Sequence, residues 1–258
     1  LVQNGDFSQI GSEEVSNGSF SQEGSELITN GDFSNGSTGW ILSGLATIGN
    51  GVASFVDDGN NTNSAITQAN VISINKTYKV TFDVVRHVLG GVQIRVGNAT
   101  AITNQLIQGV GSYTMYINSG TTSGNPNLQI KRWGGLVGWD FDIDNVSVKE
   151  VGQNWTLEDV WTIGDGVANG NGANGFSEEL LQGSILTVGK IYSITYEIKN
   201  YVSGSIKTRK PNTSSVSEDG VYTEIAEATS SSLIFTGTNF IGSITNISVK
   251  EVGQNWSL

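Results

Sequence analysis

The chain has 258 residues and a net charge of −11, from 24 acidic and 13 basic side chains. Such a chain lacks the clustered lysines and arginines that phosphate contacts need, so we expect no nucleic-acid partner. It has no cysteine, which excludes disulfides, thiolate catalysis and zinc–sulfur sites. No apolar run approaches the roughly 20 residues of a membrane span, so we expect no membrane insertion.

The first 39 residues divide into three 13-residue repeats, at 1–13, 14–26 and 27–39. Each repeat has an apolar start, then Asn-Gly, which marks a tight turn, and then Phe-Ser. One repeat cannot bury its own phenylalanine, so we expect the copies to stack on each other or on the same segment of neighbouring chains. We expect residues 1–26 to be ordered only by such self-association. A flexible acidic linker is the alternative.

Short strands are indicated through the rest of the chain. Glycine is frequent, at 34 residues, and proline is rare, at 2, which is typical of strands joined by tight turns. Period-two alternation is the strand signal, and it occurs at 80–84, 92–96, 128–131, 139–144 and 192–198. The best helical stretch, 177–182 (SEELLQ), is short. The sequence therefore predicts an all-β fold with a sandwich or barrel arrangement.

A larger duplication organises the chain. Three motifs recur in the same order: 47–54 at 162–169, 76–84 at 190–198, and 144–155 at 245–256. We therefore predict tandem jelly-roll β-sandwiches preceded by a short repetitive β segment. The expected parts are a stalk-like segment at 1–26, module 1 at 27–152, module 2 at 153–252, and the start of a further repeat or tail at 253–258. We expect the chain to be a piece of a longer repetitive protein.

Two of these stretches resemble a known class of modules. The opening LITNGDFSNGSTGW at 27–40 and the closing WDFDIDNVSV at 139–148 resemble the signatures of jelly-roll carbohydrate-binding modules of families 4, 9 and 22, within the wider galactose-binding-like fold. The resemblance covers 27–149, and reaches 155–250 only through the internal duplication. The tandem repeats also resemble repetitive tail or fibre proteins of phages and bacterial surface proteins.

A calcium site follows from the acidic closing strand and from the resemblance. Asp140, Asp142 and Asp144 alternate, so their carboxylates share one face, and a bound cation would relieve their repulsion. The resemblance places a structural Ca²⁺ in module 1 at Asp144, with Asn30 and Asp32 near the opening. The alternative is a solvent-exposed strand face.

A sugar site needs a flat apolar surface and fixed polar groups. Module 1 offers such groups on the side of its strands that faces away from the core, and the candidates are Asp83, His87, Gln93, Arg95, Gln129, Lys131 and Trp133. An ordinary outer sheet face has a similar composition. Trp40, Trp155 and Trp256 occupy matching repeat junctions, and we expect core or inter-module packing from them.

No catalytic constellation stands out, because the one histidine has no cysteine partner and the adjacent acidic pairs do not face each other across a cleft. We therefore expect no enzyme. The expected function is a structural or adhesive segment of an extracellular fibre or virion appendage, which binds glycans, cell-surface polysaccharide or neighbouring subunits as a homotrimer. The alternatives are the accessory carbohydrate-binding region of a secreted polysaccharide-degrading enzyme, or a structural decoration without a ligand.

Overall fold

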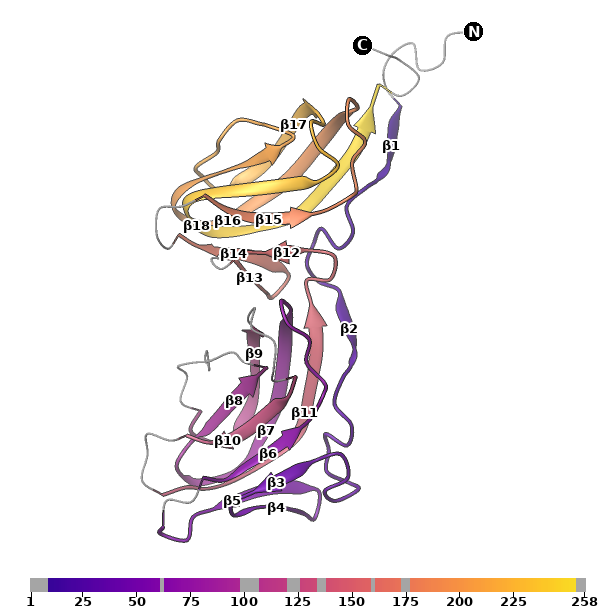
Figure 1. Ribbon diagram of the computed structural model, residues 1–258. Coiled ribbons are helices and arrows are strands. Elements are labelled where there is room, and N and C mark those ends of the chain that lie inside the picture. The colour runs from indigo at the N-terminus through magenta and orange to yellow at the C-terminus, as the bar shows by residue number, and fades with distance from the viewer. Residues whose placement is uncertain are drawn as a thin grey trace. The chain divides into compact units, whose positions relative to one another are not determined.

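The structure, a computed structural model, describes residues 9–60, 63–97, 107–119, 126–133, 138–158, 161–172 and 177–253. Every regular element in these ranges is a β-strand. The chain divides into two compact units, coloured in sequence order in Figure 1. The first unit is Glu23–Val151. The second unit joins the residues before Glu23 to those after Val151.

Two antiparallel sheets form the first unit. Its strands are β2 (Glu23–Glu26), β3 (Ile41–Ser43), β4 (Ala46–Gly49), β5 (Val52–Val56), β6 (Ala65–Gln68), β7 (Thr77–Leu89), β8 (Val92–Val96), β9 (Gly111–Asn118), β10 (Leu128–Arg132) and β11 (Asp140–Val151). The four-stranded sheet has the order β3-β6-β10-β8. The six-stranded sheet has the order β4-β5-β11-β7-β9, with β2 also paired to β11.

The core of the first unit lies between these sheets. Alternate residues of each strand point inward, as the period-two pattern predicts. Ile94 and Ile130 from the four-stranded sheet join Phe55, Phe82 and Phe141 from the six-stranded sheet in one buried cluster. The rings of Phe55 and Phe141 stack with centroids 4.8 Å apart.

The second unit uses β1 (Ile10–Glu13), β12 (Thr156–Leu157), β13 (Trp161–Gly164), β14 (Val167–Asn171), β15 (Ser177–Gln182), β16 (Ile191–Lys210), β17 (Gly220–Glu227) and β18 (Leu233–Val252). Its pairings repeat those of the first unit. β16 lies between β17 and β18, as β7 lies between β9 and β11. β18 also pairs with β15 and β14. In the first unit the corresponding pairs are β6 with β10 and β5 with β11.

The long strands β16 and β18 explain why the second unit forms one hydrogen-bonded sheet. Each supplies what two strands supply in the first unit, where β7 and β8 are separate and so are β10 and β11. The predicted all-β tandem of sandwiches with one shared topology is confirmed. The stretches 76–84 and 190–198 lie on equivalent strands.

The prediction of a separate stalk at residues 1–26 is wrong for its described part. β1 pairs with β18, and β2 pairs with β11. The closing strand of each unit, β18 or β11, has an edge that is only partly paired. β14 covers residues 241–244 of β18, and β5 covers residues 140–143 of β11. The free remainder of that edge pairs with β1 or β2, so these segments are ordered within one chain and without self-association. Residues 1–8 lie outside the described residues.

The expectation that the repeats stack on each other is wrong for the second and third repeats. Phe20 is buried in the second unit, with its ring centroid 5.1 Å from that of Trp155. Phe33 is buried in the first unit, 5.4 Å from Trp40. The two repeats therefore join different units, because Trp155 of the second unit packs on Phe20 and Trp40 of the first unit packs on Phe33. The repeats lie next to each other in sequence, and the first unit is inserted within the second.

The short helical candidate at 177–182 is strand β15. Six successive residues pair with β18, and Leu180 and Gln182 are buried alternately along it. A six-residue helix would be marginal in isolation. The open edge of β18 therefore decides the conformation of this segment.

Candidate functional site

The outer face of the four-stranded sheet in the first unit collects most of the predicted sugar-site residues. Gln129 on β10 lies opposite Arg95 on β8, and Lys131 lies opposite Gln93. Opposite residues of antiparallel strands point to the same side. Thr67 on β6 extends the row on the other side of Gln129. We call these five residues the polar face.

Trp133 lies at the end of the polar face. It follows β10 in the register of Gln129 and Lys131, and its backbone N–H donates to the carbonyl of Gly91, 2.7 Å away. The side chain is half-buried. An indole held in this way provides an apolar surface beside the polar groups.

The charged groups of the polar face are partly desolvated. Burial lowers the pKa of Lys131, and the charges of Arg95 and Arg132 lower it further. The Nε of Arg95 is buried and has no hydrogen-bond partner in the described part of the chain. Gln129 Nε2 donates a long hydrogen bond, 3.4 Å, to Thr67 Oγ1. Gln129 therefore presents a weakly bonded donor, which favours a ligand with acceptor oxygens.

The side chain of Arg132, next to Lys131 in the sequence, points away from the polar face and into the first unit. It is buried, and its guanidinium carbon lies 4.3 Å from the centroid of the Trp139 ring. Its positive charge nevertheless contributes to the lowered pKa of Lys131. The cation–π contact places this arginine in the core, where it supports the polar face from beneath.

Asp83 and His87 do not belong to the polar face, and placing them there was wrong. Both lie on β7, in the six-stranded sheet. Asp83 accepts a hydrogen bond from Asn145 Nδ2 at 2.7 Å, and His87 Nε2 lies 3.1 Å from the Gly90 carbonyl. A sandwich has two outer faces, and alternation identifies an outward side chain without telling on which face it lies.

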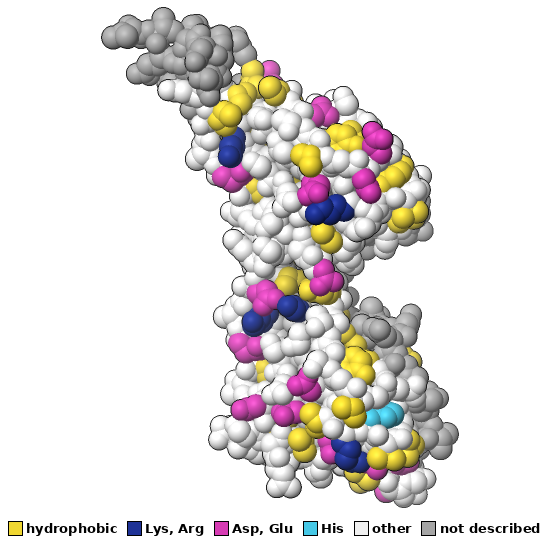
Figure 2. All heavy atoms as spheres, turned by 180° about the vertical axis from the view of Figure 1, so that it is seen from behind, with side chains coloured by type: hydrophobic (Ala, Val, Ile, Leu, Met, Phe, Trp, Pro, Cys, Tyr) yellow, Lys and Arg dark blue, Asp and Glu magenta, His cyan; other side chains and the backbone are white. Residues whose placement is uncertain are grey.

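A surface with exposed apolar side chains surrounds His87. Val85, Val88 and Leu89 of the same strand are exposed, and Figure 2 shows the histidine in cyan among hydrophobic side chains. Such a surface differs in chemistry from the polar face. His87 is therefore separate from the candidate glycan site in both position and surroundings.

The acidic closing strand is neutralised by an arginine that the sequence analysis did not single out. Arg86 binds Asp142 through Nε at 2.6 Å and Nη2 at 2.9 Å, and its Nη1 lies 2.6 Å from Asp140. A register shift after Val84 places Arg86 on the outer side, opposite Asp142. Asp142 and Asp140 raise the pKa of Arg86. Burial opposes ionisation of Asp142, but its bonds to Arg86 and Ser54 outweigh burial and leave the pKa lowered.

The proposed calcium ligands are used in other ways. Asn30 donates from Nδ2 to the Gly36 and Thr38 carbonyls and accepts from the Asn35 N–H. Asp32 accepts from Ser34 N and Oγ, and these bonds lower its pKa. Asp144 accepts from Asn145 N at 2.6 Å.

Among the described residues, no group of three or more histidine and acidic side chains is placed to hold a metal ion. Calcium at Asn30, Asp32 and Asp144 therefore stays an untested prediction. The donor set does not favour it, because both polar atoms of the Asn30 amide already serve its own loop.

The second unit does not reproduce the polar face. By register, Ile234 and Thr236 of β18 replace Gln129 and Lys131. Both are buried. Nearby, Arg209 forms an ion pair with Glu179, and Lys207 Nζ donates to Asn212 Oδ1 at 3.1 Å. Because Ile234 and Thr236 are buried where the first unit has Gln129 and Lys131, the glycan candidate lies in the first unit.

Trp40 and Trp155 have the packing role expected for the tryptophans at the repeat junctions. Both are buried against a phenylalanine, and each indole N–H donates to a backbone carbonyl. Trp256 lies outside the described residues. Two further residues, Gln68 and Gln182, were not predicted from the sequence. Both are buried; Gln68 binds the third repeat and Gln182 binds the second. Their shared position before the duplicated 76–84 and 190–198 motifs was the available signal.

No helix of the described chain is long and apolar enough to cross a membrane.

Comparisons with known proteins give matches among solved structures only. No protein-family model matches the sequence, and no curated protein matches it. Among solved structures, the chain is similar to the N-terminal CBM22-1-CBM22-2 tandem domain from Paenibacillus barcinonensis Xyn10C, with 10% identity and a TM-score of 0.38. That match covers 90% of this chain and 99% of the other.

Two enzymes also match. A Paenibacillus xanthan lyase matches at 15% identity and a TM-score of 0.28, over 82% of this chain and 25% of the lyase. An allantoicase from Saccharomyces cerevisiae matches at 9% identity and a TM-score of 0.29, over 81% of this chain and 80% of that one.

Proposed function

We propose that the chain is a non-enzymatic binding and display protein whose first unit binds glycan on the polar face. One observation carries this proposal. Arg95, Gln129 and Lys131 are half-buried in neighbouring strands, and the half-buried Trp133 follows Lys131 in the same register. Partly desolvated donors next to an aromatic ring match the alternating hydroxyl and apolar surfaces of a sugar.

The two cations of the polar face favour a glycan that carries carboxylates. Arg95 and Lys131 lie in neighbouring strands, and the described residues of β6, β8 and β10 include no acidic side chain. Burial is the main cause of the lowered Lys131 pKa, and repulsion from Arg95 adds to it. A uronate would pair with the guanidinium and lower that repulsion. A neutral glycan would leave that repulsion in place.

The pKa values of the acidic side chains favour a binding function over a catalytic one. The described carboxyl groups with displaced pKa values are Glu23, Asp32, Asp83 and Asp142, and all four pKa values are lowered. A general acid at neutral pH needs a raised pKa.

The setting we propose is an extracellular fibre or virion appendage in which tandem units display the binding face. The repeated architecture and the second unit, which lacks the polar face, support a display role. The alternative is the accessory binding region of a secreted polysaccharide-degrading enzyme. The full reading frame distinguishes them, by further repeats or by a hydrolase domain. A homotrimer remains part of the fibre proposal, and light scattering on the intact chain tests it.

The glycan proposal is tested on an array of neutral and acidic polysaccharides, followed by affinity electrophoresis. Arg95→Ala and Trp133→Ala should each weaken retention by at least tenfold, and retention should fall with salt because the contacts are charged. Asp83→Ala and His87→Ala are matched controls on the other sheet and should bind as the parent does. Unchanged binding in both face variants, or binding to neither glycan class, would contradict the proposal.

A further inference from the structure

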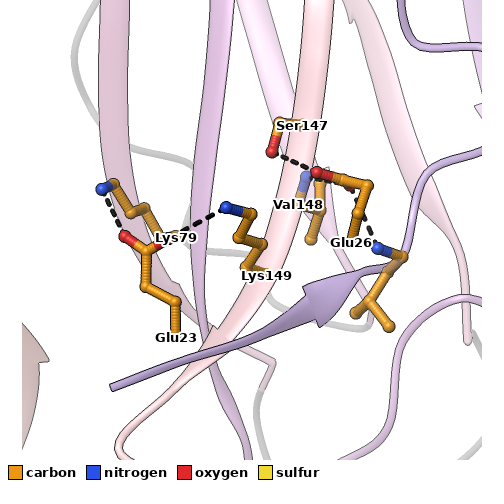
Figure 3. Close-up of polar contacts among 7 residues, drawn as sticks. Glu23, Glu26, Lys79, Ser147, Val148 and Lys149 are labelled. Atoms are coloured by element: carbon orange, nitrogen blue, oxygen red, sulfur yellow. Dashed lines mark hydrogen bonds and ion pairs between the residues drawn. The ribbon is translucent and has the colours of Figure 1, made fainter. Parts of the chain in front are cut away.

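The second and third repeats dock on their units through the same contacts. We call residues 13–20 and 26–33 the opening segments of the second and first unit. Each starts with a glutamate on the edge of the closing strand. Glu13 accepts from Val249 N at 2.7 Å and from Ser248 Oγ at 2.6 Å. Glu26 accepts from Val148 N at 2.9 Å and from Ser147 Oγ at 2.5 Å, as Figure 3 shows.

A buried glutamine side chain then bonds both the backbone N–H and the backbone carbonyl of one residue in each segment. Gln182 Oε1 accepts from Ser16 N at 2.8 Å, and its Nε2 donates to Ser16 O at 2.9 Å. Gln68 makes the same pair of bonds with Thr29, at 2.8 and 2.9 Å. Because the segment contributes only backbone atoms to these bonds, different side chains are compatible with this position.

The Asn-Gly pair allows the segment to lie close to the closing strand. Ile247 N donates to Gly18 O at 3.0 Å, and Val146 N donates to Gly31 O at 2.9 Å. A Cβ on Gly18 would lie 1.9 Å from Ile247 O, and one on Gly31 would lie 2.0 Å from Val146 O. Only glycine fits at this contact.

The asparagine and phenylalanine complete the docking. Asn17 and Asn30 have φ of 53° and 55°, a conformation that asparagine adopts more readily than most residues. The Trp155 Nε1 donates to Asn17 O at 3.1 Å, and the Trp40 Nε1 donates to Asn30 O at 3.0 Å. The phenylalanine three residues later packs on the same indole. The required sequence is therefore an apolar residue, one variable residue, Asn-Gly, one variable residue and Phe.

Residues 1–8 have this sequence. Val2, Asn4, Gly5 and Phe7 stand where the second repeat has Val15, Asn17, Gly18 and Phe20. The receiving sites of the two described units are already occupied by the other two repeats. Residues 1–8 thus have the apolar residue, the Asn-Gly pair and the phenylalanine of the motif, but no counterpart of Glu13 or Glu26 lies within them. Because the sites of the described units are filled, this motif is complementary to a further site of the same construction.

We propose that residues 1–8 are a third opening segment, and that their partner is a further jelly-roll unit of this kind. That unit receives the segment with a buried glutamine, a tryptophan at its start and an uncovered edge on its closing strand. Association then proceeds by docking of a short peptide onto a sandwich edge, a form of strand addition. The inference does not depend on glycan binding.

The first experiment grafts the segment in the full chain. Glu14→Leu, Ser16→Gln and Ser19→Asp together convert residues 14–21 into the sequence of residues 1–8. The triple variant should melt within about 3 °C of the parent, because every contact residue is kept. Phe20→Ala is the destabilised reference. A triple variant that melts as low as Phe20→Ala would overturn the proposal.

The second experiment measures docking in trans. A protease site is inserted between Gln22 and Glu23 of the full chain, which is cleaved, unfolded in urea and refolded with excess fluorescent peptide of residues 1–8. The label should co-elute with the refolded protein on size exclusion, and a Phe7→Ala peptide should not. Failure of the residue 1–8 peptide to co-elute, or equal retention of the Phe7→Ala peptide, would overturn the inference.

Discussion

The indole nitrogen of Trp155 donates a hydrogen bond to the backbone carbonyl of Asn17, 138 residues earlier in the chain. This bond joins the two sequence-distant parts of the second unit, between which the whole first unit is inserted. Residues 9–22 therefore lack their partners until the chain beyond Val151 has been made. The arrangement of the repeats in the sequence is consequently nested. The third repeat belongs to the first unit, which follows it directly, and the second repeat belongs to the second unit, most of which lies after Val151.

Gly31→Ala should destabilise the first unit by about 1–3 kcal/mol, because the new methyl would overlap the Val146 carbonyl. Gly49→Ala is the matched control in the same unit, since nothing lies within 4 Å of its added Cβ. The urea midpoint of each variant measures the effect. Equal midpoints for the two variants would show that the opening segment does not contribute to stability.

Gln182→Glu should make the docking of the second repeat depend on pH. The new carboxylate would be buried and would face the Ser16 carbonyl, so its pKa is raised above the unfolded value of about 4.3. We expect a deficit of about 1–3 kcal/mol at pH 7 relative to the parent. The deficit should shrink as the pH falls through the raised pKa, because the protonated acid donates to the carbonyl again.

Gln182→Met serves as the control for this experiment, since it removes both bonds and has no titratable group. Its deficit should be the same at every pH. Urea unfolding of the parent and both variants between pH 4 and 8 provides the comparison. A pH-independent deficit for Gln182→Glu would contradict the arrangement of bonds at Ser16.

Arg86→Met should lower stability at pH 7 by about 1 kcal/mol, a modest amount because the guanidinium is partly exposed to solvent. The pKa of Asp142 is lowered in the folded chain, so the contribution is present above the ordinary value of 3.8 and is lost as the pH falls through the folded value. The difference between variant and parent should therefore narrow at pH 3. A difference that widens in acid would contradict this pairing.

Chelation tests whether calcium binds at Asn30, Asp32 and Asp144. A bound ion would raise the melting temperature by mass action. We expect excess EDTA or added Ca²⁺ to shift the melting temperature by less than about 1 °C, because the protein's own donors already serve these side chains. A clear rise with Ca²⁺ that Asp144→Asn abolishes would establish the metal site instead.

Local patterns predicted the strands well. The alternation at 80–84 and 192–198 corresponds to β7 and β16, and the duplication correctly predicted that both units share one topology. The stretch 177–182 was misjudged as the best helical candidate, because its pairing with β18 cannot be seen in the segment itself. Period two also assigned Asp83 and Arg95 alike to an outward side, although they lie on opposite sheets.

The amino-acid sequence by itself determined the all-β class, the number of repeats and the residues of the Asn-Gly-x-Phe motif, because turn preference and side-chain alternation act between neighbours in the chain. Only the tertiary structure decided which unit each repeat completes, which sheet carries each polar side chain, and that Arg86 neutralises Asp140 and Asp142. These outcomes depend on strand edges and buried surfaces that other parts of the chain supply, and local sequence preferences do not reveal them.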